Sequence, residues 1–273
     1  MSVHFNVSPA SIFQTFAAQR GLIIELIKRD FYGRYKGSFM GIAWSLFHPL
    51  LMLVIYTFVF SVALKARWGI EHESDVGFAI VLFSGLIVHG LFAECLNRAP
   101  GLISSQPNYV KKVVFPLEII PCVTVCSALA HFIISFCLLL VFCALTGVKL
   151  TTGIALVPLV MLPLVLLTLG LTWLFASLGV YLRDITQGMG VVTTVLLFMS
   201  PVFYPVDALP EKYRVYLHFN PLTLPIEQLR NLVLWQKPIE WTSWATSLLV
   251  GSAVACFGFW WFQKSRRGFA DVL

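Results

Sequence analysis

Residues 119–148 read IIPCVTVCSALAHFIISFCLLLVFCALTGV and contain no Asp, Glu, Lys or Arg. A helix needs about 20 predominantly apolar residues to cross the hydrocarbon core of a bilayer, so this stretch is long enough to span a membrane. The rest of the chain has the same character, since 58% of its 273 residues are hydrophobic and only 12% are charged. Ordinary soluble domains carry about 25% charged residues, so part of the solvent around this chain must be lipid.

Five further stretches are long and apolar enough to cross, and the six together predict an all-α integral membrane protein with one domain over 1–273. The predicted spans are approximately 44–64, 76–96, 119–146, 154–181, 186–205 and 241–262. The longest run without charge, 150–182, exceeds a bilayer core if it is fully helical. Pro158 and Pro163 mark the place where we expect this run to be irregular.

The distribution of charge predicts the topology. An even number of spans places both termini on one side, and with the termini inside, twelve of the 19 lysines and arginines fall in cytoplasmic segments. This agrees with the positive-inside rule. The net charge of +6 therefore reflects membrane boundaries, and we predict no nucleic-acid partner. No cleavable signal is visible, because basic residues interrupt the first 43 positions.

Two segments outside the spans have helical character. Residues 8–28 mix apolar and polar side chains, which is typical of an amphipathic helix on the inner leaflet or of a short helix packed on other protein. Residues 207–240 predict two short outer helices between spans five and six. Pro210 and Pro225 start these helices, and Asn220-Pro221 forms the turn between them.

The chain shows no sequence pattern of an enzyme. It has no paired carboxylates, no HExxH and no Gly-x-Ser-x-Gly, and Asp30 is expected to stand alone at the inner boundary. Histidines 89 and 131 are expected to be packed and hydrogen-bonded, and the six cysteines to pack without disulfides. Because no Gly-x4-Gly-Lys-Ser/Thr occurs, any ATP must be bound by another polypeptide. Secondary transport is disfavoured, because buried charges are not evident.

Two weaker patterns suggest function. The loop 97–118 carries Tyr109, Lys111 and Lys112 between prolines, as expected of a docking helix for a partner ATPase or of a solvated basic loop. Aromatic residues are frequent in the first and fifth spans. They suit either a conduit for sugars, which stack on aromatic rings, or an interfacial belt.

Residues 29–44, RDFYGRYKGSFMGIAW, resemble the start of the first span in ABC-2 type permeases. Further matching pieces follow in order along nearly the whole chain: Lys111-Lys112 to Phe115-Pro116, Arg183-Asp184-Ile185, Ser200 to Tyr204, Asn220-Pro221 with Arg230, and Phe262 to Asp271. The run His48-Pro-Leu-Leu-Met-Leu, followed by Tyr56 to Ser61, is similar to the polysaccharide-exporting branch, above all to O-antigen exporters. Teichoic-acid and capsule exporters are close alternatives.

The resemblance implies a homodimer in a bacterial inner membrane, working with two copies of an ABC ATPase subunit that hold ATP and Mg. No cofactor is expected in this chain. The implied substrate is a polysaccharide linked to a polyprenyl diphosphate. The resemblance also implies an N-terminal interface helix near 9–28, a coupling helix and a pore between the protomers.

The candidate site residues form three groups. The ATPase-coupling residues are Pro107, Asn108, Tyr109, Lys111 and Lys112. The residues expected to meet the lipid diphosphate at the inner boundary are Arg29, Asp30, Arg34, Tyr35 and Lys36. The pore-lining candidates are Tyr56, Phe60, Phe198, Phe203 and Tyr204. Two other functions stay open, namely a permease for small hydrophobic compounds and a membrane enzyme of polyprenyl-linked glycan synthesis.

Overall fold

The computed structural model describes residues 19–59, 75–111, 115–148 and 151–273, and within these ranges it contains helices and no strands. The longer elements are α2 (Arg20–Gly33), α3 (Trp44–Tyr56), α4 (Asp75–Arg98), α6 (Ile119–Leu145), α7 (Val157–Tyr181), α8 (Ile185–Met199) and α11 (Trp241–Ser265). The shorter ones are α5 (Pro107–Lys111), α9 (Glu211–Phe219), α10 (Thr223–Val233) and α12 (Phe269–Val272), with 3-10 turns that include η3 (Ala99–Gly101), η4 (Thr152–Leu156) and η6 (Arg266–Gly268).

Five helical segments of the described chain are long and apolar enough to cross a membrane: Gly41–Val59, Gly77–Gly101, Ile119–Leu145, Thr152–Tyr181 and Trp241–Val272. The predicted fifth span corresponds to α8, which has 15 residues and is therefore about 22 Å long. Its helix ends because Ser200 precedes Pro201 and adopts an extended conformation at ψ 155°. The chain is a multi-pass membrane protein, and a sixth full crossing remains a prediction.

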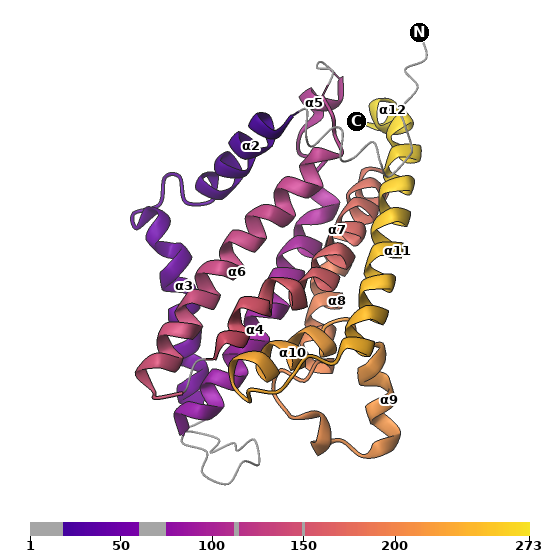
Figure 1. Cartoon of the computed structure of the whole chain (residues 1–273). Helices are drawn as coiled ribbons and strands as arrows, with labels where there is room; N and C mark the ends of the chain where they lie inside the picture. Colours follow the sequence, from indigo (N-terminus) through magenta and orange to yellow (C-terminus); the bar gives the residue numbers. More distant parts are fainter. Residues whose placement is uncertain (1–18, 60–74, 112–114, 149–150) are drawn as a thin grey trace.

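The long helices pack side by side into one bundle (Figure 1). The helices α5 and α12 lie at one end of it, together with the chain's C-terminus, and α9 and α10 lie at the other. We call these the α5 end and the α10 end. Helix α2 runs across the outside of α6, and α3 lies at the edge of the bundle.

The bundle centre is held by close helix packing. Helices α7 and α11 meet along glycines, since a Cβ at Gly170 would clash with the Val254 carbonyl, and one at Gly258 with the Gly170 carbonyl. The charge-free run 150–182 is divided at Pro158, as expected, because η4 precedes α7 and Pro158 lies in the first turn of α7. The irregularity expected at Pro163 is not found, since Pro163 lies inside the continuous helix α7. Near the C-terminus, Arg266 pairs with Glu118 at 2.7 Å and ties η6 to the start of α6.

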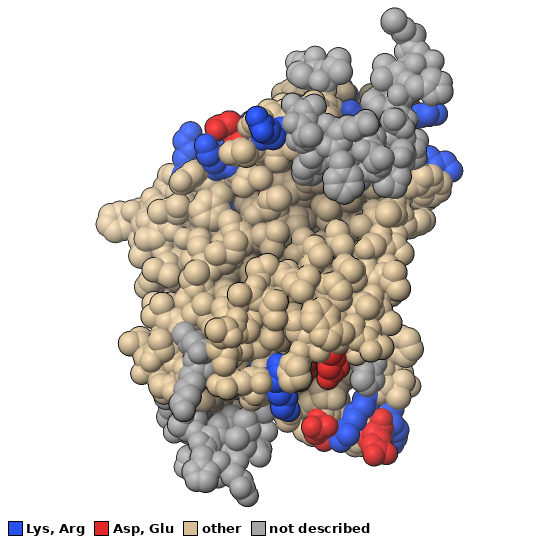
Figure 2. Space-filling view, viewed as in Figure 1, with Lys and Arg blue, Asp and Glu red and all other residues tan. Residues whose placement is uncertain are grey.

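Charged side chains gather at the two ends of the molecule (Figure 2). A broad band without visible Lys, Arg, Asp or Glu separates them on the face shown. Side chains in such a band face hydrocarbon at little cost, whereas charged groups at that depth are costly. The band therefore marks the part of the bundle that lies within the bilayer.

Candidate functional site: a helix joint and a charged cluster

The predicted coupling residues form α5, a short helix that begins at Pro107. Pro is favoured at the first helical position, where its missing N–H is not needed. Pro107, Asn108 and Lys111 are exposed at the α5 end, whereas Tyr109 is half-buried. Lys112 lies outside the described residues. The structure thus presents a short helix with a cation at its surface and an aromatic ring directed into the protein.

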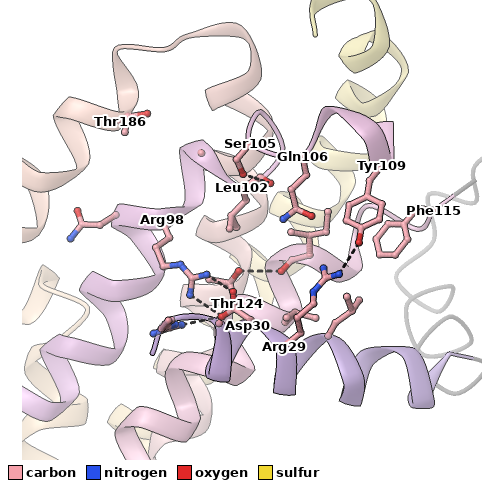
Figure 3. A pocket seen from close by; sticks show the side chains of 17 residues that line it. Arg29, Asp30, Arg98, Leu102, Ser105, Gln106, Tyr109, Phe115, Thr124 and Thr186 are labelled. Atoms are coloured by element: carbon pink, nitrogen blue, oxygen red, sulfur yellow. Dashed lines mark hydrogen bonds and ion pairs between the residues drawn. The ribbon is translucent and has the colours of Figure 1, made fainter. Parts of the chain in front are cut away.

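Tyr109 connects α5 to α2. Its ring stacks on Phe115 with the centroids 4.6 Å apart. Its hydroxyl accepts a hydrogen bond of 3.0 Å from the Arg29 guanidinium, which comes from α2 (Figure 3). A displacement of α5 would act on α2 through this contact, which we call the α2–α5 joint.

One residue along α2, a cluster of charged side chains begins. Asp30 accepts two hydrogen bonds from Arg98 of α4, at 2.6 and 3.1 Å (Figure 3). Arg34 donates at 3.2 Å to Asp30 Oδ2, which also accepts from Arg98, and it pairs with Glu94 of α4. Two-pronged pairs between arginine and carboxylate are among the stronger hydrogen-bonded pairs in proteins. We call Asp30, Arg34, Glu94, Arg98 and His131 the inner cluster.

His131 brings α6 into the inner cluster. Its Nδ1 lies 2.8 Å from Arg34 and 3.1 Å from Glu94, and its Nε2 lies 2.8 Å from the Tyr35 hydroxyl. A bare Nδ1 accepts from Arg34, whereas a protonated Nδ1 donates to Glu94, so it serves one of them at a time. The cluster therefore joins three helices, α2, α4 and α6.

The charges within the inner cluster offset each other. Burial by itself raises the pKa of Asp30, but the hydrogen bond and positive charge of Arg98, with Ser127 and Arg34, outweigh it. The pKa of Asp30 consequently lies below its ordinary value. Two carboxylates, Asp30 and Glu94, face two guanidinium groups, so the charges of these partly buried side chains are paired with each other.

The sequence-based expectation that Asp30 stands alone was wrong, and buried charges are present after all. The physical reason is that the partners come from other helices, 68 residues away in the case of Arg98. A usable signal was present, because Asp30 and Arg34, and likewise Glu94 and Arg98, are acid–base pairs four residues apart on a helix. His89 is hydrogen-bonded to the Thr193 carbonyl oxygen, as expected for a packed histidine.

The five predicted diphosphate residues are divided by the structure. Asp30 and Arg34 belong to the inner cluster, and Tyr35 contacts it through His131. Arg29 and Lys36 instead line a shallow pocket on the exposed side of α2. Neither forms an ion pair with a described carboxylate, so these two cations keep an unbalanced charge at the surface.

A cavity of about 620 Å³ lies between α2, η3, α5 and the start of α6, at the α5 end. The α2–α5 joint and the Asp30–Arg98 pair form part of its wall, and Gln106 and Thr124 add polar groups (Figure 3). Surface pockets with convergent polar groups are common binding sites. The cavity therefore offers a recess beside α5 into which part of a partner protein could fit.

The predicted pore aromatics gather toward the α10 end. Phe198 stacks on Phe203 at 5.4 Å, and the Tyr204 hydroxyl donates to the Phe198 carbonyl at 3.0 Å. Tyr56 packs against the same buried group of α4 as Phe203 does. Phe60 lies outside the described residues. Phe198 is 62% exposed, so it is free to meet lipid, a second protomer or a substrate.

Arg230 of α10 was named in the sequence only as part of the resemblance, and it was not predicted as a site residue because it was counted among the outer charges. Its side chain is fully buried. It donates to the Val81 carbonyl at 3.0 Å and to Ser84 at 3.2 Å, both on α4, and it also contacts the carbonyls of Pro201 and Val202. Arg230 thus fastens α10 to α4 and to the turn after α8.

Burial lowers the pKa of Arg230 to about 10, and the nearby Glu227 carboxylate, at 3.2 Å, partly offsets this shift. The side chain therefore remains a cation at neutral pH.

Gly85 of α4 leaves the space that the Arg230 side chain occupies. A Cβ at that position would lie 2.9 Å from the Arg230 guanidinium and 3.3 Å from the Val202 Cα. At the α10 end, the buried Arg230 cation is therefore hydrogen-bonded to backbone carbonyl oxygens, and these bonds hold the helices together.

An apolar helical bundle with a joint, a charged cluster and a recess at one end defines a multi-pass membrane protein with a surface suited to a partner. Residues 21–234 match the model of the family described as ABC-2 type transporter. The match covers most of the chain, and the protein belongs to this family.

Proteins named for polysaccharide export are similar to this chain over most of its length. The O-antigen export system permease protein RfbA of Myxococcus xanthus is 29% identical, over 74% of this chain and 76% of the relative. A protein of the same name from Klebsiella pneumoniae is 25% identical, over 92% and 95%. The polysialic acid transport protein KpsM of Escherichia coli is 25% identical, over 80% and 83%.

Proposed function

We propose that this chain is the permease subunit of an ABC transporter that exports lipid-linked O-antigen polysaccharide across the inner membrane. The observation that carries the proposal is its similarity, over 92% of its length, to a permease named for O-antigen export. Family membership supports a transport role, since the residues 21–234 match ABC-2 type transporters. An enzymatic role has no comparable support.

Export of capsular polysaccharide is the second candidate. It is favoured by the similarity to KpsM and to the capsule polysaccharide export protein CtrC of Neisseria meningitidis, which is 23% identical over 94% of this chain. None of the relatives described above is named for the export of teichoic acid or of small hydrophobic compounds. O-antigen export remains the first candidate, because the highest of these identities, 29%, is to an O-antigen export permease, and a second permease of that name combines 25% identity with 92% of this chain.

The proposed assembly is a homodimer of this chain with two copies of an ABC ATPase. The permease has no P-loop motif, so ATP and Mg are held by the partner. Both termini are cytoplasmic in the proposed topology, which has six spans. It is supported by the excess of Lys and Arg in the segments assigned to the inside and by the position of α5 and α12 at one end (Figure 1).

Energy is transmitted, in this proposal, from the ATPase to α5 and then into the bundle. The ATPase occupies the recess beside α5 and moves that helix. Tyr109 passes the movement to Arg29 on α2. The inner cluster then carries it to α4 through Asp30 and Arg98, and to α6 through His131.

The substrate contacts follow from charge and aromaticity. Arg29 and Lys36 attract the diphosphate, because their charges are not balanced by a described carboxylate. Arg34, Asp30 and Tyr35 hold α2 against the bundle through their contacts with Glu94, Arg98 and His131. The sugar chain passes Tyr56, Phe60, Phe198, Phe203 and Tyr204, where weak stacking at several positions lets a polymer bind and move on.

The location of the polysaccharide in cells that lack this gene tests the proposal. An antibody to the surface glycan is applied to intact and to permeabilised cells, and the gene is restored in a control strain. We expect loss of glycan from the surface, with lipid-linked polymer inside. Absence of polymer from both places would indicate synthesis instead of export, and unchanged surface glycan would refute the substrate.

A further inference from the structure

A second cavity, of about 530 Å³, lies inside the protomer between α3, α4 and α6. It is separate from the recess beside α5, although Arg34 lines both. One face of α3 forms its first wall, with Trp44, His48, Met52 and Tyr56 at helical spacing. The opposite wall comes from α4 and α6.

The polar groups of this cavity lie at one end. Arg34, Tyr35 and Glu94 are found there, with His131 beside them, and their neighbours on α3 are Ser45 and His48. The side chains of Arg34, Glu94 and His131 are each about one-fifth exposed, so they are accessible from the cavity. Farther along, the walls are apolar and are formed by Met52, Phe83, Leu86, Ile87 and Phe132. The cavity is therefore polar at one end and apolar at the other, as an amphiphilic ligand is.

Its length matches one leaflet of a membrane. Along α4, the lining extends from Glu94 at the polar end to Phe83, which at 1.5 Å per residue is about 16 Å. The hydrocarbon core of a bilayer is about 30 Å thick, so one leaflet is about half of that. The cavity from its polar end to Phe83 is therefore about as deep as one leaflet, which suits a lipid whose headgroup lies at the α5 end.

The charges at the polar end indicate the kind of headgroup. Arg34 supplies one cation and Glu94 one carboxylate, and the two are already paired with each other. A headgroup with both a phosphate and an ammonium can contact each of them and leave the site neutral, whereas a purely anionic headgroup adds an unbalanced charge. The window around α3 is only 6% buried within the protomer, so the cavity adjoins a helix at the outer edge of the bundle.

We propose that this cavity binds a zwitterionic phospholipid of the inner leaflet, with one acyl chain between α3, α4 and α6 and its headgroup at Arg34 and Glu94. The lipid fills the space that separates α3 from α4 and sets the distance between these helices. The inference uses the orientation proposed above, but it does not depend on which polymer is exported.

Photolabelling of the full chain in vesicles tests the site. The protein is reconstituted into phosphatidylethanolamine and phosphatidylglycerol with a trace of phosphatidylethanolamine that carries a photoactivatable acyl chain, and the labelled peptides are identified by mass spectrometry. We expect labels on α3, α4 and α6 at residues that line the cavity. Phosphatidylglycerol with the same photoactivatable chain is expected to label them several-fold less.

Gly90→Leu provides the decisive variant. Gly90 lines the cavity, and no atom lies within 4 Å of the position that its Cβ would occupy, so a leucine side chain can start there and extend into the chain-binding part. We expect labelling at the cavity to fall several-fold. Gly190→Leu on α8 is the matched control, since its position is equally open and is not part of the cavity. A second variant, Ser135→Leu on α6, serves if Gly90→Leu does not fold.

Equal labelling in wild type and in a folded cavity-filling variant would overturn the site. Labelling by phosphatidylglycerol as strong as that by phosphatidylethanolamine would overturn the zwitterionic headgroup. Displacement of the probe by a polyprenyl phosphate, but not by excess phosphatidylethanolamine, would show that the cavity belongs to the carrier of the substrate and would also overturn the proposal.

Discussion

The Arg29 guanidinium donates a hydrogen bond of 3.0 Å to the Tyr109 hydroxyl, although the two residues are 80 positions apart in the chain. Arg29 lies on α2 and Tyr109 on α5, so this bond connects the helix proposed to meet the ATPase with the helix that runs across the bundle. The next residue of α2, Asp30, opens the inner cluster. The bond and the cluster form one continuous path from α5 to α4 and α6.

Replacing Tyr109 with Phe tests this joint. The variant keeps the ring that stacks on Phe115 and removes only the hydroxyl. A hydrogen bond of this kind contributes about 1 kcal/mol, which is about a fivefold change in an equilibrium. We expect export of surface glycan to fall by about that factor, with unchanged amounts of the complex. Tyr216→Phe on the exposed face of α9 is the control, and an equal effect of both changes would argue against a specific joint.

Reversing the charges of Lys111 and Lys112 tests the docking role of α5. Lys111 is exposed at the surface of that helix. The double replacement by Glu should abolish stimulation of the ATPase and remove glycan from the surface, because it reverses the charge that α5 presents to the ATPase in the proposed assembly. Lys212→Glu at the α10 end should leave both unchanged. Stimulation at the wild-type level in the double variant would rule out the assignment.

Asp30→Asn tests the inner cluster and carries a dependence on pH. The folded pKa of Asp30 lies below its ordinary value of about 4, so its contribution to stability is complete above that pH and is lost as pH falls through the folded pKa. We expect the variant to unfold several degrees lower at pH 7, with the deficit shrinking below about pH 4. Thermal unfolding in detergent measures this, with the exposed Asp271→Asn as control. A deficit that does not change between pH 7 and pH 3 would contradict the ionic origin.

Arg230→Ala should be among the most damaging single changes. It removes the hydrogen bonds of Arg230 to the carbonyls of Val81 and Val202 and leaves the Glu227 carboxylate without its cation. Loss of one partner of a buried pair costs about 3–5 kcal/mol. Arg230→Lys keeps the charge, so it should restore part of the stability. Arg214→Ala is the control, because Arg214 also bonds to carbonyls but is 34% exposed. If Arg230→Ala were as thermally stable as the Arg214 variant, Arg230 would not stabilise the packing of α10 on α4 as we infer.

The long apolar helices could be predicted from sequence, because the length and composition of a membrane-spanning run are local properties. The fifth span shows the limit of that reasoning. Apolar residues continue beyond Met199, yet the helix stops there, since Ser200 is extended before Pro201. The charge-free composition of 186–205 does not report this change of backbone conformation.

The inner cluster and the contacts of the buried Arg230 show why the geometry of the site was harder to predict than the helices. Each charge reads as a boundary residue in sequence, because composition does not say which helices bring Arg98 to Asp30 or bury Arg230 beneath Val81. Spacing was informative for Asp30 and Arg34, which lie on one face of α2. It held no information on His131, whose partners come from α2 and α4.

Transport in vesicles tests the central claim most directly. This chain and its ATPase partner are reconstituted with labelled polysaccharide on a polyprenyl diphosphate, and a membrane-impermeant glycan-binding protein detects polymer on the face opposite to the ATPase. We predict that polymer appears there only with ATP and Mg, and that a catalytically dead ATPase or the permease alone gives none. Polymer that crosses at the same rate without ATP, or that does not cross with an active ATPase bound, would contradict the account.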